Sequence, residues 1–386
     1  MSAPAPTVEE GLRAAKGPRF VRALSRCLGG HPAPDTTIHP LDQMFLHSLA
    51  EHRDIGAALS QYFNIARQQH DAFAQVIEAL LPGRSGLRIL DFACGFGRLL
   101  RFLPQRYPAA NIWAGEIQPE ALRFVGETFG VNTLASTGDP ADFAAELRFD
   151  VIWVASLFSH LPDHLFRGWL ARLHSMLAAD GILCFSVRPS DLRAGANSGG
   201  EFSYSPDSEV SPLGGEIYGT AHASQAYVDE VVRSAVGGRG AFRLVRALAN
   251  EQDLYVLARD PAMPLDPLQG FRRGPWGWLD RKRIDSAGRV SLQGWAGSMD
   301  GGGAASPDVR VGGEPMAVAC GILRNDVAAA FDDPDLLHSG WSVDGTAGGM
   351  DSGSAWIEVT ANEAGRTALV YAGELEAEAA GEHGRC

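Results

Sequence analysis

The sequence predicts an α/β protein built on a doubly wound parallel sheet, followed by a C-terminal antiparallel β sandwich. Short apolar runs alternate with helical patterns four times between residues 88 and 187, as in consecutive strand–helix units. The first apolar run ends in a tight glycine turn. After residue 275 the pattern changes to short alternating runs separated by glycine-rich turns, which is typical of a small β sandwich.

The stretch RILDFACGFGRLLRFL, residues 88–103, organises the predicted sheet. Residues 88–92 are apolar almost throughout, as in a strand buried on both faces, and Asp91 closes this strand. Residues 94–97 form a turn, and residues 98–103 have the apolar spacing of a helix. This order places the turn at the carboxyl end of the sheet, where open α/β folds bind ligands. Two glycines without Cβ let a ligand lie against bare backbone.

The spacing of the glycines narrows the class of ligand. A dinucleotide fingerprint needs a third glycine at the position of Leu100, so a pyrophosphate cofactor is disfavoured. The stretch instead resembles the first motif of class I S-adenosylmethionine (SAM)-dependent methyltransferases, an acidic strand end followed by G-x-G-x-G, with Ala93 at the first glycine. The resemblance implies a Rossmann-like methyltransferase sheet, SAM as cofactor and S-adenosylhomocysteine as product. The alternative is a buried strand and turn without a ligand.

Two further acidic residues stand at strand ends. Glu116 follows a predicted strand at 111–116 and lies 19 residues after Gly97, where an acidic side chain accepts hydrogen bonds from both ribose hydroxyls in nucleotide-binding folds. The alternative for Glu116 is a helix-flanking charge. Asp139 follows the third predicted strand, at the point where the family often bonds the adenine amino group. The alternative for Asp139 is an ordinary turn and helix cap.

The resemblance also implies a contact from a helix before the first strand. In many members of the family an aromatic residue there covers the methionine end of SAM, and Tyr62, within a predicted helix at 56–81, is the candidate. A core aromatic is the equally supported alternative. The predicted cofactor-binding residues are Tyr62, Asp91, Ala93, Cys94, Gly95, Gly97, Glu116, Ile117, Asp139 and Ser156.

The acceptor side is expected at the fourth and fifth strands, residues 150–156 and 181–187. Between the fifth strand and a helix at 224–234 lies a polar, glycine-rich insertion, about 188–223, which in this fold commonly covers the acceptor. His160, after the fourth strand, is the first candidate for a general base, since an imidazole titrates near neutrality. In the alternative, the histidine only holds its loop. The other candidate catalytic residues are His222, Glu216 and Tyr218.

No metal is predicted, because Asp191, Glu201, Asp207 and Glu209 show no regular ligand spacing. The five cysteines are odd in number and scattered, without a C-x-x-C pair, so neither a disulfide scaffold nor a zinc site is supported. The formal net charge is −13, and the stretch from residue 275 onward, with 17 acidic and 8 basic residues, carries −9 of it. Such a balance argues against nucleic acid as a partner. Without an apolar leader or a long apolar run, a soluble cytoplasmic protein without a membrane span is expected.

The predicted domain order starts with a flexible arm, residues 1–40, and a methyltransferase domain, residues 41–260. A hairpin at 242–248 and 253–259 ends this domain. A linker at 261–275 leads to the β sandwich at 276–373 and an acidic tail at 374–386. The sandwich contains Gly-Trp pairs at Trp278, Trp295 and Trp341, and resembles accessory β domains of bacterial glycosyltransferases and methyltransferases. Its tryptophans are predicted to fill the core, with stacking on sugars as the alternative.

The predicted function is O-methylation of a sugar hydroxyl on a glycan or bacterial surface polysaccharide, by in-line displacement. The C-terminal domain would then contact glycan-synthesis proteins. One alternative is a methyltransferase for a small metabolite or a protein side chain, and a second is a non-catalytic scaffold that keeps the fold. The acidic charge and the accessory domain favour the glycan, but the sugar itself rests on association.

Overall fold

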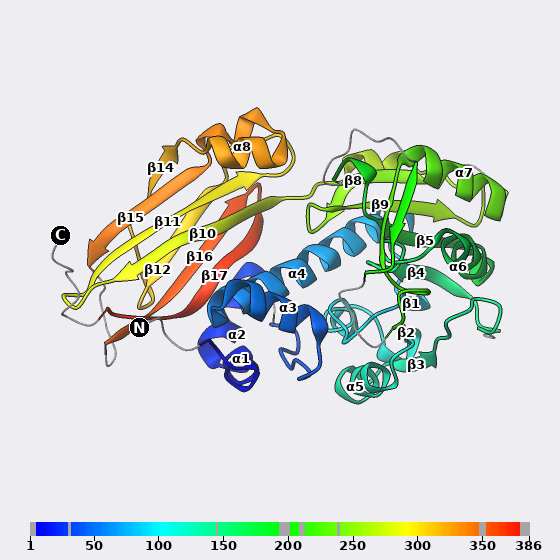
Figure 1. Cartoon of the computed structure of the whole chain (residues 1–386), viewed down its shortest axis with the longest axis horizontal. Coiled ribbons are helices and arrows are strands. Elements are labelled where there is room, and N and C mark those ends of the chain that lie inside the picture. Colours follow the sequence, from blue (N-terminus) through cyan, green and yellow to red (C-terminus); the bar gives the residue numbers. More distant parts are fainter. Residues whose placement is uncertain are drawn as a thin grey trace. The chain divides into compact units, whose positions relative to one another are not determined.

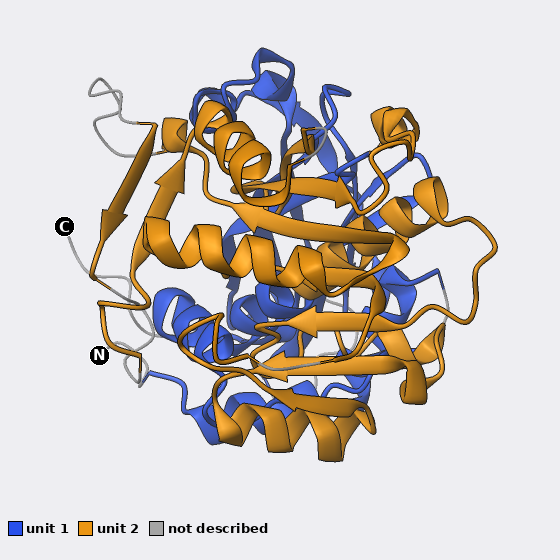
Figure 2. Ribbon diagram, turned by 90° about the vertical axis from the view of Figure 1, so that its right-hand side faces the viewer, with its two compact units in different colours: residues 1–65, 272–386 blue, residues 66–271 orange. Residues whose placement is uncertain are grey.

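The computed structural model describes residues 5–29, 32–143, 146–192, 201–207, 213–237, 240–346 and 353–378. The chain divides into two compact units (Figure 2). One unit combines residues 1–65 with 272–386, and the other comprises residues 66–271. This division differs from the predicted one, because residues 41–65 group with the C-terminal sheets and not with the parallel sheet.

The unit of residues 66–271 is built on a seven-stranded sheet of order β3-β2-β1-β4-β5-β9-β8 (Figure 1). β9 runs antiparallel to β5 and β8, and the other neighbouring pairs are parallel. The chain leaves β1 toward β2 and β3 and then returns to the other side of β1 with β4, so β1 and β4 form the switch point where such folds bind ligands. The strands are β1 (Ile89–Phe92), β2 (Ile112–Glu116), β3 (Asn132–Ala135), β4 (Phe149–Val154), β5 (Leu177–Val187), β8 (Phe242–Leu248) and β9 (Gln252–Ala258).

Helices cover both faces of this sheet, because its strands are apolar on both sides. On β4, Val151 and Trp153 join the buried cluster of one face, and Ile152 and Val154 join that of the other. The C-terminal half of α4 (Ile55–Leu80) and α5 (Pro119–Phe129) pack on the first face. The second face is covered by α6 (Asp163–Ser175) and α7 (Gln225–Val236) (Figure 1). The predicted doubly wound α/β sheet is confirmed.

The helix predicted at residues 98–103 is wrong. Residues 98–102 form turns, with Arg101 N–H donating to the Gly97 carbonyl at 3.3 Å, and a short 3₁₀ helix η1 follows at Leu103–Gln105. Pro104 explains the difference, since proline disfavours helical geometry in the residue before it and has no N–H to donate. The apolar residues of this stretch still face the core, because Leu99 and Leu100 are buried.

The described parts of the insertion contain a small two-stranded sheet, β6 (Phe202–Ser205) paired with β7 (Thr220–Ala223), and a 3₁₀ helix η3 (Ser190–Leu192). Two short 3₁₀ segments, η2 (Ala109–Asn111) and η4 (Asp266–Gly270), complete this unit.

The unit of residues 1–65 and 272–386 holds two four-stranded antiparallel sheets, of order β10-β11-β15-β14 and β13-β12-β16-β17. Leu292 and Val343 of the first sheet share one buried cluster with Val309 and Val359 of the second, so the predicted β-rich C-terminal domain is confirmed. The elements are β10 (Pro275–Ile284), β11 (Arg289–Ser298), β12 (Ser306–Val311), β13 (Glu314–Pro315), β14 (Ala319–Ile322), β15 (Gly340–Thr346), β16 (Ser354–Glu363), β17 (Arg366–Glu376), α8 (Asn325–Phe331) and η5 (Pro334–His338).

The Gly-Trp pairs at Trp278, Trp295 and Trp341 lie within β10, β11 and β15. The glycine of one such pair lies within β11 for a packing reason. A Cβ on Gly294 would lie 2.2 Å from the Trp278 carbonyl oxygen and 2.6 Å from the Trp341 ring. Trp341 is buried in the shared core, as predicted, and Trp295 is buried in a smaller cluster beside it. Trp278 is half-buried and lies against the His52 ring, with 4.8 Å between ring centroids.

The prediction of a flexible arm at residues 1–40 is wrong. Residues 8–27 form two helices, α1 (Val8–Ala15), which a capping box at Thr7 begins, and α2 (Pro18–Cys27). Phe20 of α2 is 1% exposed and lies 5.3 Å from the Phe63 ring, between centroids. Arg26 donates to both carboxylate oxygens of Glu358 on β16, and this bidentate pair raises the pKa of the guanidinium.

The first turns of α4 cover a sheet edge. β17 is the last strand of its sheet, so its outward N–H groups need partners. Ser60 Oγ accepts from Ala372 N–H at 2.8 Å, and Asn64 Oδ1 accepts from Leu369 N–H at 3.2 Å. A further helix, α3 (Gln43–His52), packs beside them. Because β17 continues to Glu376, the predicted acidic tail begins later than residue 374.

A substitution in α2 tests whether these helices are part of the core. We expect Phe20→Ala to lower the free energy of unfolding by about 3–5 kcal/mol, as for other buried phenylalanines. Leu41→Ala, at a side chain 53% exposed, should change it by less than about 0.5 kcal/mol. Urea denaturation followed by circular dichroism measures both values, and equal stabilities for the two variants would contradict the docking of α2.

Candidate functional site

The candidate site lies at the carboxyl ends of β1, β2 and β4. Three residues of the turn after β1 have left-handed backbone: Ala93 at φ 56°, Gly95 at 52° and Gly97 at 80°. For a residue with a side chain this conformation costs about 1–2 kcal/mol, so Ala93 holds strain where the family motif has glycine. Ser156, two residues after β4, has φ 62° as well. Strained residues of this kind cluster at ligand-binding sites.

The two glycines of the turn serve different purposes. A Cβ on Gly97 would lie 2.5 Å from the Phe129 ring and 3.1 Å from Val125, so Gly97 is required for packing against α5. A Cβ on Gly95 would meet no atom within 4 Å among the described residues. The backbone at Gly95 is therefore open to a ligand.

Asp91 lies beneath this turn and is 2% exposed. Its Oδ2 atom has no hydrogen-bond partner among the described residues. Burial, with the nearby Glu116 carboxylate as a second cause, raises the pKa of Asp91 from 3.8 to about 8. An acid that is buried and unpaired on one oxygen can accept a hydrogen bond from a ligand, and it favours a cationic donor.

Glu116, at the end of β2, shapes the turn. Its Oε2 accepts from Gly95 N–H at 2.8 Å, and its Oε1 accepts from the N–H groups of Ile117 at 2.8 Å and Gln118 at 3.0 Å. Burial raises the pKa of this carboxyl, and the three N–H donors oppose that rise. A carboxylate has about four lone-pair positions, so Glu116 keeps capacity for one ligand hydroxyl. Cys94 N–H donates to the Gly115 carbonyl at 3.2 Å and ties the turn to β2.

A buried hydrogen-bond network fixes the end of β4. Ser156 N–H donates to Ser186 Oγ on β5 at 2.7 Å, and Ser186 Oγ lies 2.6 Å from Gln252 Oε1 on β9. The Gln252 amide nitrogen donates to Ser156 Oγ at 3.0 Å. The sequence did not indicate these two residues, because Ser186 lies inside an apolar strand pattern and Gln252 lies in the polar stretch before the strand predicted at 253–259.

The structure brings two of the candidate catalytic residues together. The His160 ring stacks on the Tyr218 ring, with 4.5 Å between centroids and planes 8° apart. His160 Nδ1 lies 2.7 Å from the Gly219 carbonyl oxygen. Backbone bonds from Gly219 N–H to His160 O and from Ala221 N–H to Ser159 O, both 2.8 Å, hold β7 of the insertion on this loop. Because a carbonyl only accepts, this contact assigns the proton of the neutral imidazole to Nδ1.

The other two candidate catalytic residues also belong to the insertion. Glu216 is exposed, and His222 is half-buried on β7 opposite Ser203. Asp139 is exposed and its Oδ1 accepts from Ala141 N–H at 2.8 Å, which is the turn geometry named as its alternative. Its contact with adenine stays a prediction. Glu209 lies outside the described residues.

The assignment of Tyr62 to the cofactor is corrected by its surroundings. Its ring is 1% exposed and packs against Phe45 and Phe63 in the cluster that joins the N-terminal helices to β17. Its hydroxyl donates to Asp42 Oδ2 at 2.6 Å. Tyr62 is therefore a core aromatic, the alternative that the sequence left open.

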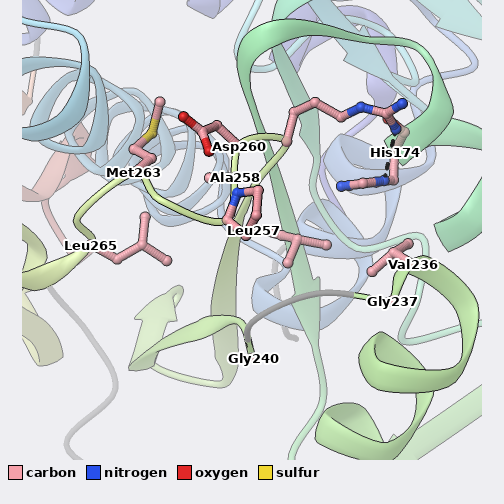
Figure 3. A pocket seen from close by; sticks show the side chains of 11 residues that line it. His174, Val236, Gly237, Gly240, Leu257, Ala258, Asp260, Met263 and Leu265 are labelled. Carbon is pink, nitrogen blue, oxygen red and sulfur yellow. Dashed lines mark hydrogen bonds between the residues drawn. The ribbon is translucent and has the colours of Figure 1, made fainter.

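A pocket in the same unit lies at the opposite sheet edge (Figure 3). Because β9 is antiparallel, its last residue, Ala258, stands at the amino edge of the parallel strands, and the pocket forms there with His174 of α6. Burial and Arg259 lower the pKa of His174, whose Nδ1 lies 3.3 Å from the Arg259 guanidinium. Within the described residues, no group of three His, Cys, Asp or Glu could hold a metal. No described helix is both long and apolar enough to span a bilayer.

Replacing Asp91 by Asn tests its burial. In the unfolded chain the carboxyl titrates near 3.8, and in the fold at about 8, so the folded protein binds an extra proton between these values and loses stability as pH rises through them. Asp91→Asn removes this penalty. We therefore expect a Tm several degrees above wild type at pH 8, with the difference vanishing near pH 4, measured by calorimetry in the absence of ligand. A variant less stable than wild type at pH 8 would contradict a raised pKa.

Comparison with known proteins finds similarity in the segment that contains this site. Residues 89–181 match a family model described as a methyltransferase domain. The malonyl-[acyl-carrier protein] O-methyltransferase of Acetivibrio thermocellus is 27% identical over 139 residues, which cover 33% of this chain and 48% of that protein. The trans-aconitate 2-methyltransferase of Deinococcus radiodurans is 28% identical over 121 residues, covering 31% of this chain and 45% of that protein. The chain thus spans about half the length of these relatives.

Solved structures of methyltransferases are similar as well. An amino pentose methyltransferase from Micromonospora echinaspora, with SAM bound, is 18% identical with a TM-score of 0.39, covering 51% of this chain and 92% of that one. The matched segment, residues 89–181, runs from β1 into β5 and contains the glycine turn, Glu116 and the end of β4. This segment is therefore similar to the catalytic domain of methyltransferases.

Proposed function

We propose that the protein binds SAM at the turn after β1 and transfers its methyl group to an oxygen of an acceptor held at the ends of β4 and β5. One observation carries the proposal: the unpartnered, buried Oδ2 of Asp91 lies beneath a turn whose Gly95 backbone is open. Both features fit a nucleoside ligand with a cationic amino group, which SAM is. When bound, SAM supplies a methyl group on a sulfonium, which an acceptor oxygen displaces in line.

The residues of the turn would bind and orient this cofactor. Asp91 would accept from the amino group, Gly95 would let the cofactor approach the backbone, and Glu116 would accept from one ribose hydroxyl. Cys94 and Ile117 contribute through their backbone, since the N–H of each already fixes the geometry of the turn. Orientation alone supplies a large part of such a reaction, because well-oriented partners reach effective molarities of about 10⁵–10⁸ M.

His160 would accept the acceptor's proton. With its proton on Nδ1, held by the Gly219 carbonyl, the neutral ring presents Nε2 as the basic nitrogen. Stacking on Tyr218 fixes the plane of the ring. Glu216 and His222 remain second candidates for this role.

A sugar hydroxyl of a glycan is our first proposal for the acceptor, supported by the acidic charge and the β-rich C-terminal domain. That domain would recruit a glycan or glycan-synthesis proteins. A small carboxylic metabolite is the second candidate, because the two curated relatives described above are named for methylation of malonyl-[acyl-carrier protein] and trans-aconitate. If the protein transferred a methyl group to no acceptor, the alternative of a non-catalytic scaffold would remain.

Calorimetric titration with SAM and S-adenosylhomocysteine tests the cofactor. We expect micromolar binding to the wild type and at least a tenfold weaker affinity for Glu116→Ala, which loses the ribose acceptor and the bond to Gly95 N–H. Glu127→Ala, an exposed acid on the neighbouring helix, is the matched control and should bind as wild type. Absence of binding to the folded wild type would refute the cofactor assignment.

The affinity for SAM should depend on pH through Asp91. Below about 8 this carboxyl is protonated in the empty protein, and binding a cationic amino group requires it to release that proton. We therefore expect the dissociation constant to fall by up to tenfold per pH unit as pH rises from 6 to 8. Asp91→Asn should abolish this slope, and an equal slope in both proteins would contradict the role of Asp91.

His160→Asn separates catalysis from loop support, because the Asn amide can still donate to the Gly219 carbonyl while Nε2 is lost. If His160 is the base, methyl transfer to any active acceptor from a panel of sugars and carboxylic acids should fall by about 10²–10⁴-fold. The affinity for S-adenosylhomocysteine should not change. If His160→Asn turns over at the wild-type rate, His160 is not the base and only holds its loop.

A further inference from the structure

An unusual polar side chain occupies the hairpin between β8 and β9. Asn250 is 5% exposed, and neither its amide oxygen nor its amide nitrogen has a hydrogen-bond partner among the described residues. Turn asparagines are normally solvated, because loops run over the surface. A buried polar group without a partner costs about 1–3 kcal/mol, so it calls for a physical explanation.

A second unpartnered amide adjoins this turn. Gln68 of α4 is 3% exposed, and its Oε1 accepts from Ala249 N–H at 2.7 Å. Its Nε2 atom, like Asn250, has no partner within the described parts of the chain. Gln68 thus bonds to the residue next to Asn250, and the two side chains carry three buried atoms without a partner among the described residues.

The hairpin itself is strained and well anchored. Ala249 and Asn250 have consecutive left-handed conformations, with φ 53° and 57°. Asp253, three residues further on, is fully engaged, by the Arg243 guanidinium at 2.7 Å and Arg246 N–H at 2.8 Å. Asp253 is therefore satisfied within the hairpin, whereas Asn250 is not.

The position of the turn connects these amides to the site. β9 begins beside the carboxyl end of β5, where Asp253 pairs with Val187, so the turn before β9 lies at the same sheet edge as Asp91. Gln252, two residues after Asn250, donates to Ser156 Oγ at the end of β4. The amides therefore stand on the half of the edge beyond β4, opposite to the nucleoside-binding half of β1 and β2.

We propose that Gln68 and Asn250 form a binding site for a ligand carboxylate, with the Nε2 of Gln68 and the Nδ2 of Asn250 as donors. Two primary amides offer four N–H groups, which suit the two oxygens of a planar carboxylate. The Asn250 amide oxygen remains as an acceptor for an adjacent ligand hydroxyl or amine. The proposal rests on the proposed function, and the carboxylate belongs either to the methionine end of SAM or to the acceptor.

Isosteric acids test the site with little change of shape. Asn250→Asp and Gln68→Glu replace each amide nitrogen by an oxygen, which repels a carboxylate. Gln68→Glu still offers an oxygen acceptor to Ala249 N–H. Asparagine and aspartate both tolerate left-handed backbone. Asn250→Gly, which also tolerates it, removes the amide without adding charge. Gln69→Glu, on the same helix and 7% exposed, controls for a new buried acid.

The probes distinguish the two sources of the carboxylate. Calorimetry at pH 8 would use S-adenosylhomocysteine, 5′-methylthioadenosine, which lacks the amino-acid end, and malonate or trans-aconitate added to protein saturated with S-adenosylhomocysteine. If the cofactor supplies the carboxylate, S-adenosylhomocysteine binds the variants at least tenfold more weakly and 5′-methylthioadenosine binds unchanged. If the acceptor supplies it, S-adenosylhomocysteine binds unchanged and binding of the small acids is lost.

Either result supports the carboxylate site, provided that Gln69→Glu behaves as wild type. Unchanged affinity of all variants for all four probes would overturn the proposal. Failure of the proposed function gives a different pattern, because neither nucleoside would then bind the wild type. In that case the small acids, titrated into the empty wild type and the variants, still decide on the amide pair: loss of binding in the variants supports it, and equal or absent binding overturns it.

Discussion

The burial of two carboxylates, Asp91 and Glu116, on neighbouring strands is the constraint on which the site depends. The buried Glu116 carboxylate accepts hydrogen bonds from three backbone N–H groups. One of these groups belongs to Gly95, so Glu116 fixes the backbone of the turn. Burial and the nearby Glu116 carboxylate raise the pKa of Asp91 to about 8, and no described residue donates to its Oδ2. Glu116 thereby holds the backbone of the turn, and Asp91 stays available for a charged ligand.

The remaining polar groups of the same edge follow this division. Ser156, Ser186 and Gln252 satisfy one another and fix the end of β4, as Glu116 fixes the end of β1. Gln68 and Asn250 resemble Asp91, because each has a buried side-chain atom without a partner among the described residues. Satisfied groups give an edge its shape, and unsatisfied groups give it affinity, since a ligand that completes their hydrogen bonds removes their cost.

The other unit shows how remote parts of a chain complete one core. β17 is the last strand of its sheet, and its N–H groups donate to side-chain oxygens from the first turns of α4. α2 adds an apolar side chain and an ion pair with β16. The N-terminal helices and the C-terminal sheets therefore form a single folded unit, although more than 200 residues separate them in sequence.

The sequence by itself determined the parallel sheet, its order of strands and helices, the glycine turn and the acidic residues Asp91 and Glu116. These features follow from local patterns, in which apolar periodicity and turn residues act over a few positions. Only the tertiary structure decided the position of Tyr62, the folding of residues 8–27 and the contact of Gln68 with the backbone of Ala249, 181 residues further along the chain. Each of these depends on which distant surface covers a side chain, and burial of that kind leaves no signal in the local pattern.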